Sequence, residues 1–247
     1  MHDYQAPQDL FNEKIILVTG AGDGIGKEAA KQYAAHGATV ILLGKTTKKL
    51  EAVYDEIMAA GGPEPAIIPL DMRGATTQHY ADMALTIEQT FGRLDGILHN
   101  AGLLGVLSPF AQIEEQTWID IMQVNVTAAA FMTQALLPMM KKQDAASIVF
   151  TTSSVGRQGR AFWGTYAISK FATEGMMQTM ADEYENSGVR VNCINPGATR
   201  TNMRARAYPA EDATRLKMPA DIMPLYLYLM GKDSEGVTGQ SFDAQPK

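Results

Sequence analysis

Short apolar segments that alternate with helical patterns along the whole chain constrain its fold more than any other feature. Each segment is apolar along nearly its full length rather than at every second residue, which is typical of strands buried on both faces of a parallel sheet. The segments cover residues 14–19, 39–43, 66–70, 96–99, 146–151 and 189–194, with a weaker one at 240–242. Strands of this kind need helices on both sides.

Helical patterns fill the intervals between these segments. They cover residues 24–36, 47–60, 76–91, 112–140, 163–187 and 219–230. Pro138 is expected to interrupt the fourth pattern near its end. The alternation predicts an α/β fold with a Rossmann-type, doubly wound parallel sheet flanked by helices. Because no linker or repeat divides the chain, we expect residues 1–247 to form a single domain, a length that such folds reach.

Composition and charge narrow the partners and the compartment. The formal net charge is -6 at pH 7, so nucleic acid is not an expected partner. Residues 1–9 are polar and the apolar runs are too short to cross a bilayer, so we expect neither a signal peptide nor a membrane partner. The single cysteine, Cys193, is interpreted as a buried strand residue. These features favour a cytoplasmic protein, and the sequence nominates no metal ligands.

A glycine-rich loop, Thr19-Gly20-Ala21-Gly22-Asp23-Gly24-Ile25-Gly26, joins the first strand to the first helix. Glycine lets the backbone approach a phosphate closely, and the helix N-terminus supplies free N–H groups and a partial positive charge. The loop therefore predicts a site for the pyrophosphate of a dinucleotide, with a tight turn that binds nothing as the alternative. The residues expected to contact the cofactor there are Gly20, Gly22, Asp23, Gly24, Ile25 and Gly26.

The end of the second strand indicates which dinucleotide binds. An acidic residue there would bind the ribose 2′-hydroxyl and repel a 2′-phosphate. The run Val40-Ile41-Leu42-Leu43-Gly44-Lys45-Thr46 contains no acidic residue, and Lys45 stands just beyond this position. Lys45, helped by Thr46, could hold a 2′-phosphate, which predicts a preference for NADP(H) over NAD(H). We interpret the following Lys48 and Lys49 as solvating a helix start.

Tyr166 and Lys170 lie four residues apart in a helical pattern, which places both side chains on one helix face. A free tyrosine has a pKa of about 10 and is a poor acid–base catalyst near neutrality. Because a neighbouring ammonium stabilises the phenolate, we expect Lys170 to lower the pKa of Tyr166. That tuning is what general acid–base catalysis needs. Taken alone, such a pair is also common on exposed helix faces.

Together these motifs resemble the short-chain dehydrogenase/reductase family. The glycine-rich loop matches its TGxxxGxG signature, and Tyr166 with Lys170 matches its YxxxK motif. The resemblance spans nearly the whole chain. Within the family, stretches at 154–160, 171–177 and 242–246 look like the YciK-type bacterial oxidoreductases.

The resemblance implies further site residues. Ser153, in preference to its neighbour Ser154, should hydrogen-bond the substrate oxygen. Asn125 should support a water that relays protons through Lys170, which also holds the nicotinamide ribose. Further cofactor contacts are implied for Asp71 and Met72 at the adenine, for Asn100, Ala101 and Gly102 beside the cofactor, and for Pro196, Gly197, Thr199 and Thr201 at the carboxamide and diphosphate.

The implied activity is NADP(H)-dependent oxidoreduction, with hydride passing between the nicotinamide and a carbonyl or hydroxyl substrate. The residues implied to carry the chemistry are Tyr166, Lys170, Ser153 and Asn125. An NADP-binding sensor or scaffold without turnover is the alternative, and it is disfavoured because such proteins tend to lose the tyrosine or the lysine. An epimerase or dehydratase on this fold would carry TGxxGxxG and a longer C-terminal region. His99, where the family commonly has asparagine, is interpreted as structural.

The segment after Gly197 closes over the substrate in this family, and here it is rich in charge. Arginine binds carboxylate or phosphate bidentately, so an anionic small-molecule substrate is one hypothesis, and a solvated lid of mixed charge is the other. The cationic residues concerned are Arg204, Arg206, Arg215 and Lys217, with Arg157 and Arg160 before Tyr166. By resemblance, the helices containing Asn125 and Tyr166 form the interface of a homodimer or homotetramer.

Overall fold

A seven-stranded parallel sheet forms the centre of the computed structural model, which describes residues 1–246. The strand order is β3-β2-β1-β4-β5-β6-β7, and all neighbouring strands run parallel. The strands are β1 (Ile15–Thr19), β2 (Thr39–Gly44), β3 (Ala66–Pro69), β4 (Gly96–His99), β5 (Ala146–Thr151), β6 (Val189–Asn195) and β7 (Ser241–Asp243). This arrangement confirms the predicted Rossmann-type, doubly wound sheet.

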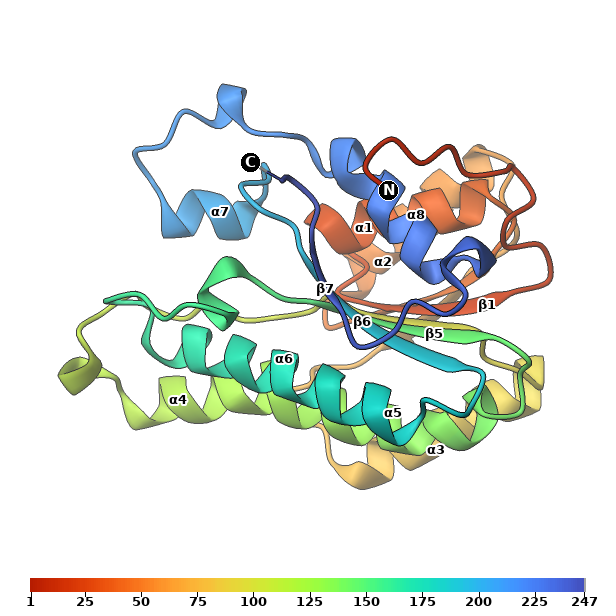
Figure 1. The fold of residues 1–247 in the computed structure, drawn as a ribbon, viewed down its shortest axis with the longest axis horizontal. Coiled ribbons are helices and arrows are strands. Elements are labelled where there is room, and N and C mark those ends of the chain that lie inside the picture. The colour runs from red at the N-terminus through yellow and green to blue at the C-terminus, as the bar shows by residue number, and fades with distance from the viewer. Residues whose placement is uncertain (247) are drawn as a thin grey trace.

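Helices cover both faces of the sheet, as Figure 1 shows. One face carries α3 (Thr77–Phe91), α4 (Glu115–Met122), α5 (Ala128–Met140) and α6 (Gly164–Glu183). The other face carries α1 (Gly24–Ala35), α2 (Thr47–Ala59) and α8 (Met223–Met230). Within residues 1–246, no helix combines the length and the apolar composition needed to span a membrane.

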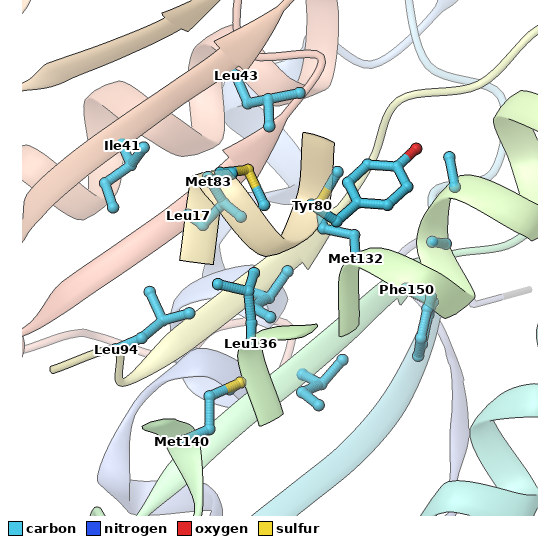
Figure 2. Close-up of a cluster of buried hydrophobic side chains, with 14 of the residues drawn as sticks. Leu17, Ile41, Leu43, Tyr80, Met83, Leu94, Met132, Leu136, Met140 and Phe150 are labelled. Carbon is cyan, nitrogen blue, oxygen red and sulfur yellow. The ribbon is translucent and has the colours of Figure 1, made fainter. Parts of the chain in front are cut away.

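The pleat of the strands divides their residues between two apolar cores. Leu17 and Ile41 belong to the core shown in Figure 2, which also contains side chains from α3 and α5. Their chain neighbours Ile16 and Leu42 belong to the second core, with α1, α2 and α8. Successive side chains of a strand point to opposite faces, so a sheet covered on both sides needs an apolar residue at every position. This requirement explains the unbroken apolar runs in the sequence.

The helical pattern at 112–140 is built differently from the prediction. A short 3-10 turn, Phe110–Gln112, precedes α4, and a π-helical segment, Gln123–Thr127, joins α4 to α5. Pro138 does not interrupt the helix, because α5 continues to Met140. Proline removes one N–H donor, and α5 tolerates the loss of this single hydrogen bond. The irregularity lies in the π-helical segment instead.

A short helix, α7 (Asn202–Ala207), follows β6 and was not predicted. Its six residues are too few to show a helical apolar period. Thr201 caps it by accepting a hydrogen bond from the N–H of Arg204 at 3.1 Å. Figure 1 shows α7 standing apart from both helix layers.

Candidate active site

The carboxyl ends of the strands open into one cleft with a volume of about 760 Å³. In open α/β sheets, ligands bind at this edge where the strand order reverses, here between β1 and β4. Residues from the loops after six strands, β1 to β6, line the cleft. All the predicted site residues line it except Gly26 and Asn125, which support lining residues from behind.

The glycines of the dinucleotide loop permit close backbone approach. Gly20 and Gly24 have φ angles of +68° and +55°, in the left-handed region that favours glycine. A Cβ atom on Gly26 would overlap the carbonyl oxygen of Gly20 and lie 2.5 Å from Nδ2 of Asn100. The loop brings the N-terminus of α1 to the cleft, where its free N–H groups fit a pyrophosphate.

Asp23 joins three elements at the rim of this loop. Its carboxylate accepts hydrogen bonds from the N–H of Gly24 at 2.8 Å, Nζ of Lys49 at 2.7 Å and Nδ2 of Asn202 at 3.0 Å. The hydrogen bond from Lys49 is the main cause that lowers the pKa of Asp23. Lys49 therefore does more than solvate a helix start, contrary to our interpretation, and Asn202 links the segment around α7 to the dinucleotide loop.

Two cations lie where the loops after β2 and β3 line the cleft. Lys45 is exposed and has no hydrogen-bond or ion-pair partner among the described residues 1–246. Arg73 lines the same cleft and pairs with Asp71 at 3.5 Å and Asp120 at 3.6 Å. The N–H of Arg73 is the main cause that lowers the pKa of Asp71. Nothing in the sequence pattern pointed to Arg73, although it directly follows the expected pair Asp71 and Met72.

Thr19 ties the end of β4 to the end of β1. Its Oγ1 accepts hydrogen bonds from the N–H groups of Asn100 at 3.0 Å and Ala101 at 3.1 Å. A Cβ atom on Gly20 would lie only 3.0 Å from Cα of Ala101, so the two loops are in close contact. Asn100, Ala101 and Gly102 form one wall of the cleft.

Tyr166, Lys170 and Ser153 all line the cleft, the first two from α6 and Ser153 from the loop after β5. Burial raises the pKa of Tyr166 to about 12, and a hydrogen bond with Ser153 opposes the shift. We expected Lys170 to lower this pKa; the expected direction is wrong for this structure, because burial is the largest influence on the pKa of Tyr166 and raises it. Ser154 is exposed outside the cleft, so the structure separates the two candidate serines.

The side chain of Lys170 is held by the backbone. Its Nζ donates to the carbonyl oxygen of Thr151 at 2.7 Å and lies 5.6 Å from the ring centre of Tyr166. Lys170 is buried, and this burial lowers its pKa to about 8, while the nearby Cys193 and Glu174 oppose the shift. Its charge therefore changes close to neutral pH.

Asn125 lies in the π-helical segment, a feature that often marks functional sites. Its Oδ1 accepts from the N–H of Leu103 at 2.7 Å, and its Nδ2 donates to the carbonyl of Leu103 at 2.9 Å and to Oγ of Ser169 at 3.0 Å. The side chain thus fixes the loop after β4 against α6. Both amide hydrogens are engaged, and the expected water relay stays a prediction.

The tail of the chain holds the turn at Pro196 and Gly197. Nε2 of Gln245 donates to the carbonyl of Pro196 at 2.9 Å and to Oγ1 of Thr199 at 3.2 Å. Gly197 has a φ of +70°, and a Cβ atom there would press on Gln245. Thr201 follows as the cap of α7. The predicted carboxamide and diphosphate contacts therefore belong to a turn that is braced from two sides.

Residues 201–217, here called the lid, form part of the cleft wall. An ion pair joins two side chains within the lid. Nε and Nη2 of Arg204 donate to the two carboxylate oxygens of Glu211, both at 2.6 Å. The guanidinium lies 3.8 Å from the ring centre of Tyr208. Trp163 lies between Tyr208 at 5.9 Å and Tyr166 at 5.8 Å, measured between ring centres. These aromatic contacts join distant segments, which spacing along the chain cannot locate.

The arginines proposed for an anionic substrate are not equivalent. Arg204 is paired within the lid, and Arg157 pairs with the carboxylate of Asp243. Arg206 is exposed and lines the cleft, with no carboxylate within ion-pair distance among residues 1–246. An anion hypothesis that depends on Arg157 and Arg204 is therefore weakened, because both already neutralise protein carboxylates.

His99 and Cys193 are buried within the sheet. Nε2 of His99 lies 2.7 Å from Oγ1 of Thr133, and its ring stacks on Phe150 at 4.8 Å. Burial lowers the pKa of His99 to about 3, so the ring is neutral in the physiological range. Burial raises the pKa of the Cys193 thiol. The prediction that Cys193 is a buried strand residue is confirmed.

Comparison with known proteins identifies the family. The short chain dehydrogenase family matches residues 14–212. The oxidoreductase YciK of Escherichia coli (strain K12) is 59% identical over 246 residues, which cover 100% of this chain and 97% of YciK. The chain therefore belongs to the short chain dehydrogenase family.

Two solved structures of similar proteins contain a nicotinamide cofactor. A short chain dehydrogenase of Shigella flexneri 2a strain 301 was crystallised with NADP. It is 59% identical with a TM-score of 0.95, and the match covers 97% of this chain and 100% of the Shigella chain. A short chain dehydrogenase of Escherichia coli CFT073 was crystallised with NADPH. It is also 59% identical with a TM-score of 0.95, and the match covers 98% of this chain and 100% of the Escherichia coli chain.

Proposed function

We propose that this protein is an NADP(H)-dependent oxidoreductase that acts on a carbonyl or alcohol group of a small molecule. The observation that carries the proposal is that Tyr166, Lys170 and Ser153 share one cleft with the glycine-rich dinucleotide loop. When bound there, the nicotinamide supplies a hydride in reduction and accepts one in oxidation.

The residues of the chain handle the proton and the substrate oxygen. Tyr166, with a pKa raised to about 12, keeps its proton at neutral pH and donates it to the oxygen during reduction. Ser153 donates a hydrogen bond to the same oxygen and polarises the carbonyl. Lys170 supplies positive charge beside Tyr166 and binds the nicotinamide ribose. Asn125 positions the loop at Leu103 that faces them.

The preference for NADP(H) is supported from two sides. Lys45 is free to pair with a 2′-phosphate, and Arg73 lies in the same part of the cleft. Similar proteins at 59% identity were crystallised with NADP and NADPH. No acidic residue follows β2 to repel the phosphate.

Isothermal titration of NADPH and NADH, followed by a screen of carbonyl compounds read as NADPH consumption, tests the proposal. We expect tight NADPH binding and turnover that falls at least about 10²-fold in Tyr166→Phe. Tyr184→Phe, at the far end of the same helix, is the matched control and should leave turnover unchanged. Binding without turnover across a broad panel would favour a sensor, and no binding at all would contradict both functions.

We propose that the substrate carries an anionic group and that this group contacts Arg206. It is the cleft arginine without an internal carboxylate partner in the described chain. Arg206→Ala should raise KM for a carboxylated ketone and leave KM for its methyl ester unchanged. Arg160→Ala, an exposed arginine outside the cleft lining, serves as control. Equal effects on the acid and the ester would contradict the contact.

We also propose that a second copy of the chain packs on α4, α5 and α6. Large apolar side chains are exposed along these helices, namely Ile119, Phe131, Ile168 and Phe171. A face of this kind favours the predicted homodimer or homotetramer. Light scattering of Phe131→Glu and Phe171→Glu should show a smaller particle than the native protein.

We further propose that the protein is cytoplasmic, as predicted from the sequence. Fractionation of the host cell would test this location.

A further inference from the structure

A buried carboxylate lies one helical turn beyond Lys170. Glu174 follows Lys170 by four residues in α6, so both side chains lie on the same face of the helix. Glu174 is 6% exposed and Lys170 is 5% exposed. Glu174 does not line the cleft, and none of the steps proposed for the reaction uses it. A charge removed from water in this way is unfavourable unless hydrogen bonds and an opposite charge compensate it.

Ser241 of β7 supplies a hydrogen bond to this carboxylate. Its Oγ donates to Oε1 of Glu174 at 2.9 Å. Ser241 pairs with Cys193, which pairs with Phe150, so the three residues form a row across β7, β6 and β5. Cys193 and Phe150 belong to the apolar core that also contains side chains of α6. Because paired residues of neighbouring strands share a face of the sheet, the register of β7 points Ser241 toward α6.

Lys170 is the cation that can compensate this carboxylate. Within residues 1–246, no cationic group lies within ion-pair distance of Glu174. Arg157, the other cation near this part of β6, pairs with Asp243, which lies two residues beyond Ser241 in β7. Arg157 is therefore already neutralised, and Glu174 and Lys170 are left as two buried opposite charges one turn apart.

The other titratable groups that face Lys170 carry no charge at neutral pH. Tyr166 keeps its proton because burial raises its pKa to about 12. His99, which borders a small cavity with Lys170, is neutral because burial lowers its pKa to about 3. Burial lowers the pKa of Lys170, and Cys193 and Glu174 oppose the shift. Cys193 can oppose it only as a thiolate, and burial raises the pKa of that thiol, so the effective anion is Glu174.

We propose that Glu174 is a positioning residue for the reaction: its buried carboxylate, held by Ser241, keeps Lys170 positively charged beside Tyr166. The charge on Lys170 then stabilises the developing phenolate and binds the nicotinamide ribose. The strand β7 thereby contributes to the proton chemistry, although none of its residues lines the cleft. This inference rests on the proposed oxidoreductase function.

The pH profile of carbonyl reduction tests the role of the charge. Glu174→Gln removes the charge and keeps an oxygen that can accept the hydrogen bond from Ser241. In the native protein kcat/KM should decline as pH rises through about 8, and in Glu174→Gln the midpoint of this decline should lie about one pH unit lower. Glu174→Asp keeps the charge and should restore most of the native profile.

Glu183→Gln is the matched control, because it removes an exposed carboxylate from the end of the same helix. It should leave the profile unchanged. A role for Glu174 in packing alone would lower the rate at every pH and leave the midpoint in place. A native midpoint in Glu174→Gln would therefore overturn the proposal.

Stability measurements test the charge pair without turnover. Urea unfolding at pH 7 compares the native protein with Lys170→Met, Glu174→Gln and the double variant. Lys170→Met leaves the carboxylate buried without its cation, so it should lower the free energy of unfolding. Glu174→Gln should destabilise the native protein but stabilise Lys170→Met, because there it removes the uncompensated charge.

The two experiments separate a failed inference from a failed function. Additive losses of stability in the double variant would overturn the charge pair, whether or not a carbonyl compound is reduced. Absence of turnover in the native protein would contradict the proposed function alone, and the unfolding measurements would still decide whether Glu174 compensates Lys170.

Discussion

Lys170 donates a hydrogen bond to the backbone carbonyl of Thr151 at 2.7 Å, while its Nζ stands 5.6 Å from the ring centre of Tyr166. The strand end therefore places the ammonium, and its position does not depend on the phenol. Burial lowers the pKa of Lys170 to about 8 and raises that of Tyr166 to about 12. Across the pH range of ordinary assays, Lys170 changes charge and Tyr166 does not.

The pH dependence of reduction should therefore report Lys170. As pH rises through about 8, Lys170 loses its proton and the positive charge that stabilises developing phenolate disappears, so kcat/KM should fall. Lys170→Met should lower kcat/KM about 10²-fold or more and remove the decline above pH 8. Initial rates of NADPH oxidation between pH 6 and pH 10 check this, with rates in Lys141→Met as the control. An unchanged alkaline decline in Lys170→Met would assign it to another group.

Gly26→Ala should abolish cofactor binding. The added Cβ would overlap the carbonyl oxygen of Gly20 and lie 2.5 Å from Nδ2 of Asn100, so the dinucleotide loop would have to move. Gly175→Ala is the matched control, because Gly175 is also inside a helix and has open space around it. That change should stabilise the protein by up to about 1 kcal/mol through helix propensity. Calorimetric titration and thermal melts of both variants give the comparison; native NADPH affinity in Gly26→Ala would refute the close approach.

The fold was predictable from the sequence because it depends on local patterns. The strands begin and end within a residue or so of their apolar runs, since both faces of the sheet are buried. The predictions that failed did so for different reasons. Pro138 removes only one hydrogen bond and α5 continues past it, and α7 is too short to show a period. The π-helical segment Gln123–Thr127 depends on how α4 and α5 pack, which the periodicity does not record.

The sequence predicted only those parts of the site that are short motifs with a fixed spacing along the chain. The glycine-rich loop and the pair Tyr166 and Lys170 are short motifs, and the fold brings them into one cleft. The direction of the pKa shift of Tyr166 was wrong, because burial depends on residues from several segments. The contact of Trp163 with Tyr208, like the ion pair of Arg157 with Asp243, joins distant parts of the chain. No spacing rule reaches those.

Lys45→Ala should weaken the preference for NADPH. An exposed lysine that binds a 2′-phosphate contributes a charge-assisted hydrogen bond, so NADPH affinity should fall about 10-fold while NADH affinity stays unchanged. Lys48→Ala, an exposed lysine three residues on that lies outside the cleft lining, should alter neither affinity at moderate salt. Calorimetric titrations with both cofactors measure the ratio. Equal losses for NADPH and NADH would show that Lys45 acts on the shared part of the dinucleotide.

His99 should make the protein sensitive to acid. Its pKa is about 3 in the folded state, against about 6.5 for an unperturbed histidine, so between these values the unfolded chain binds the extra proton. The contribution of His99 is fully present above pH 6.5 and is lost as pH falls toward 3. By this linkage alone, the free energy of unfolding should drop by roughly 2–3 kcal/mol between pH 7 and pH 4.5.

His99→Gln keeps a hydrogen-bonding group near Thr133 and does not titrate, so urea unfolding at the two pH values isolates the histidine. We expect a lower stability at pH 7 from the lost stacking on Phe150, and a smaller decrease on acidification than in the native protein. His2→Gln, at the exposed N-terminal segment, should leave both the stability and its pH dependence unchanged. If the free energy of unfolding fell equally on acidification in the native protein and in His99→Gln, carboxylates alone would account for the lost stability. His99 would then gain its proton within the folded sheet.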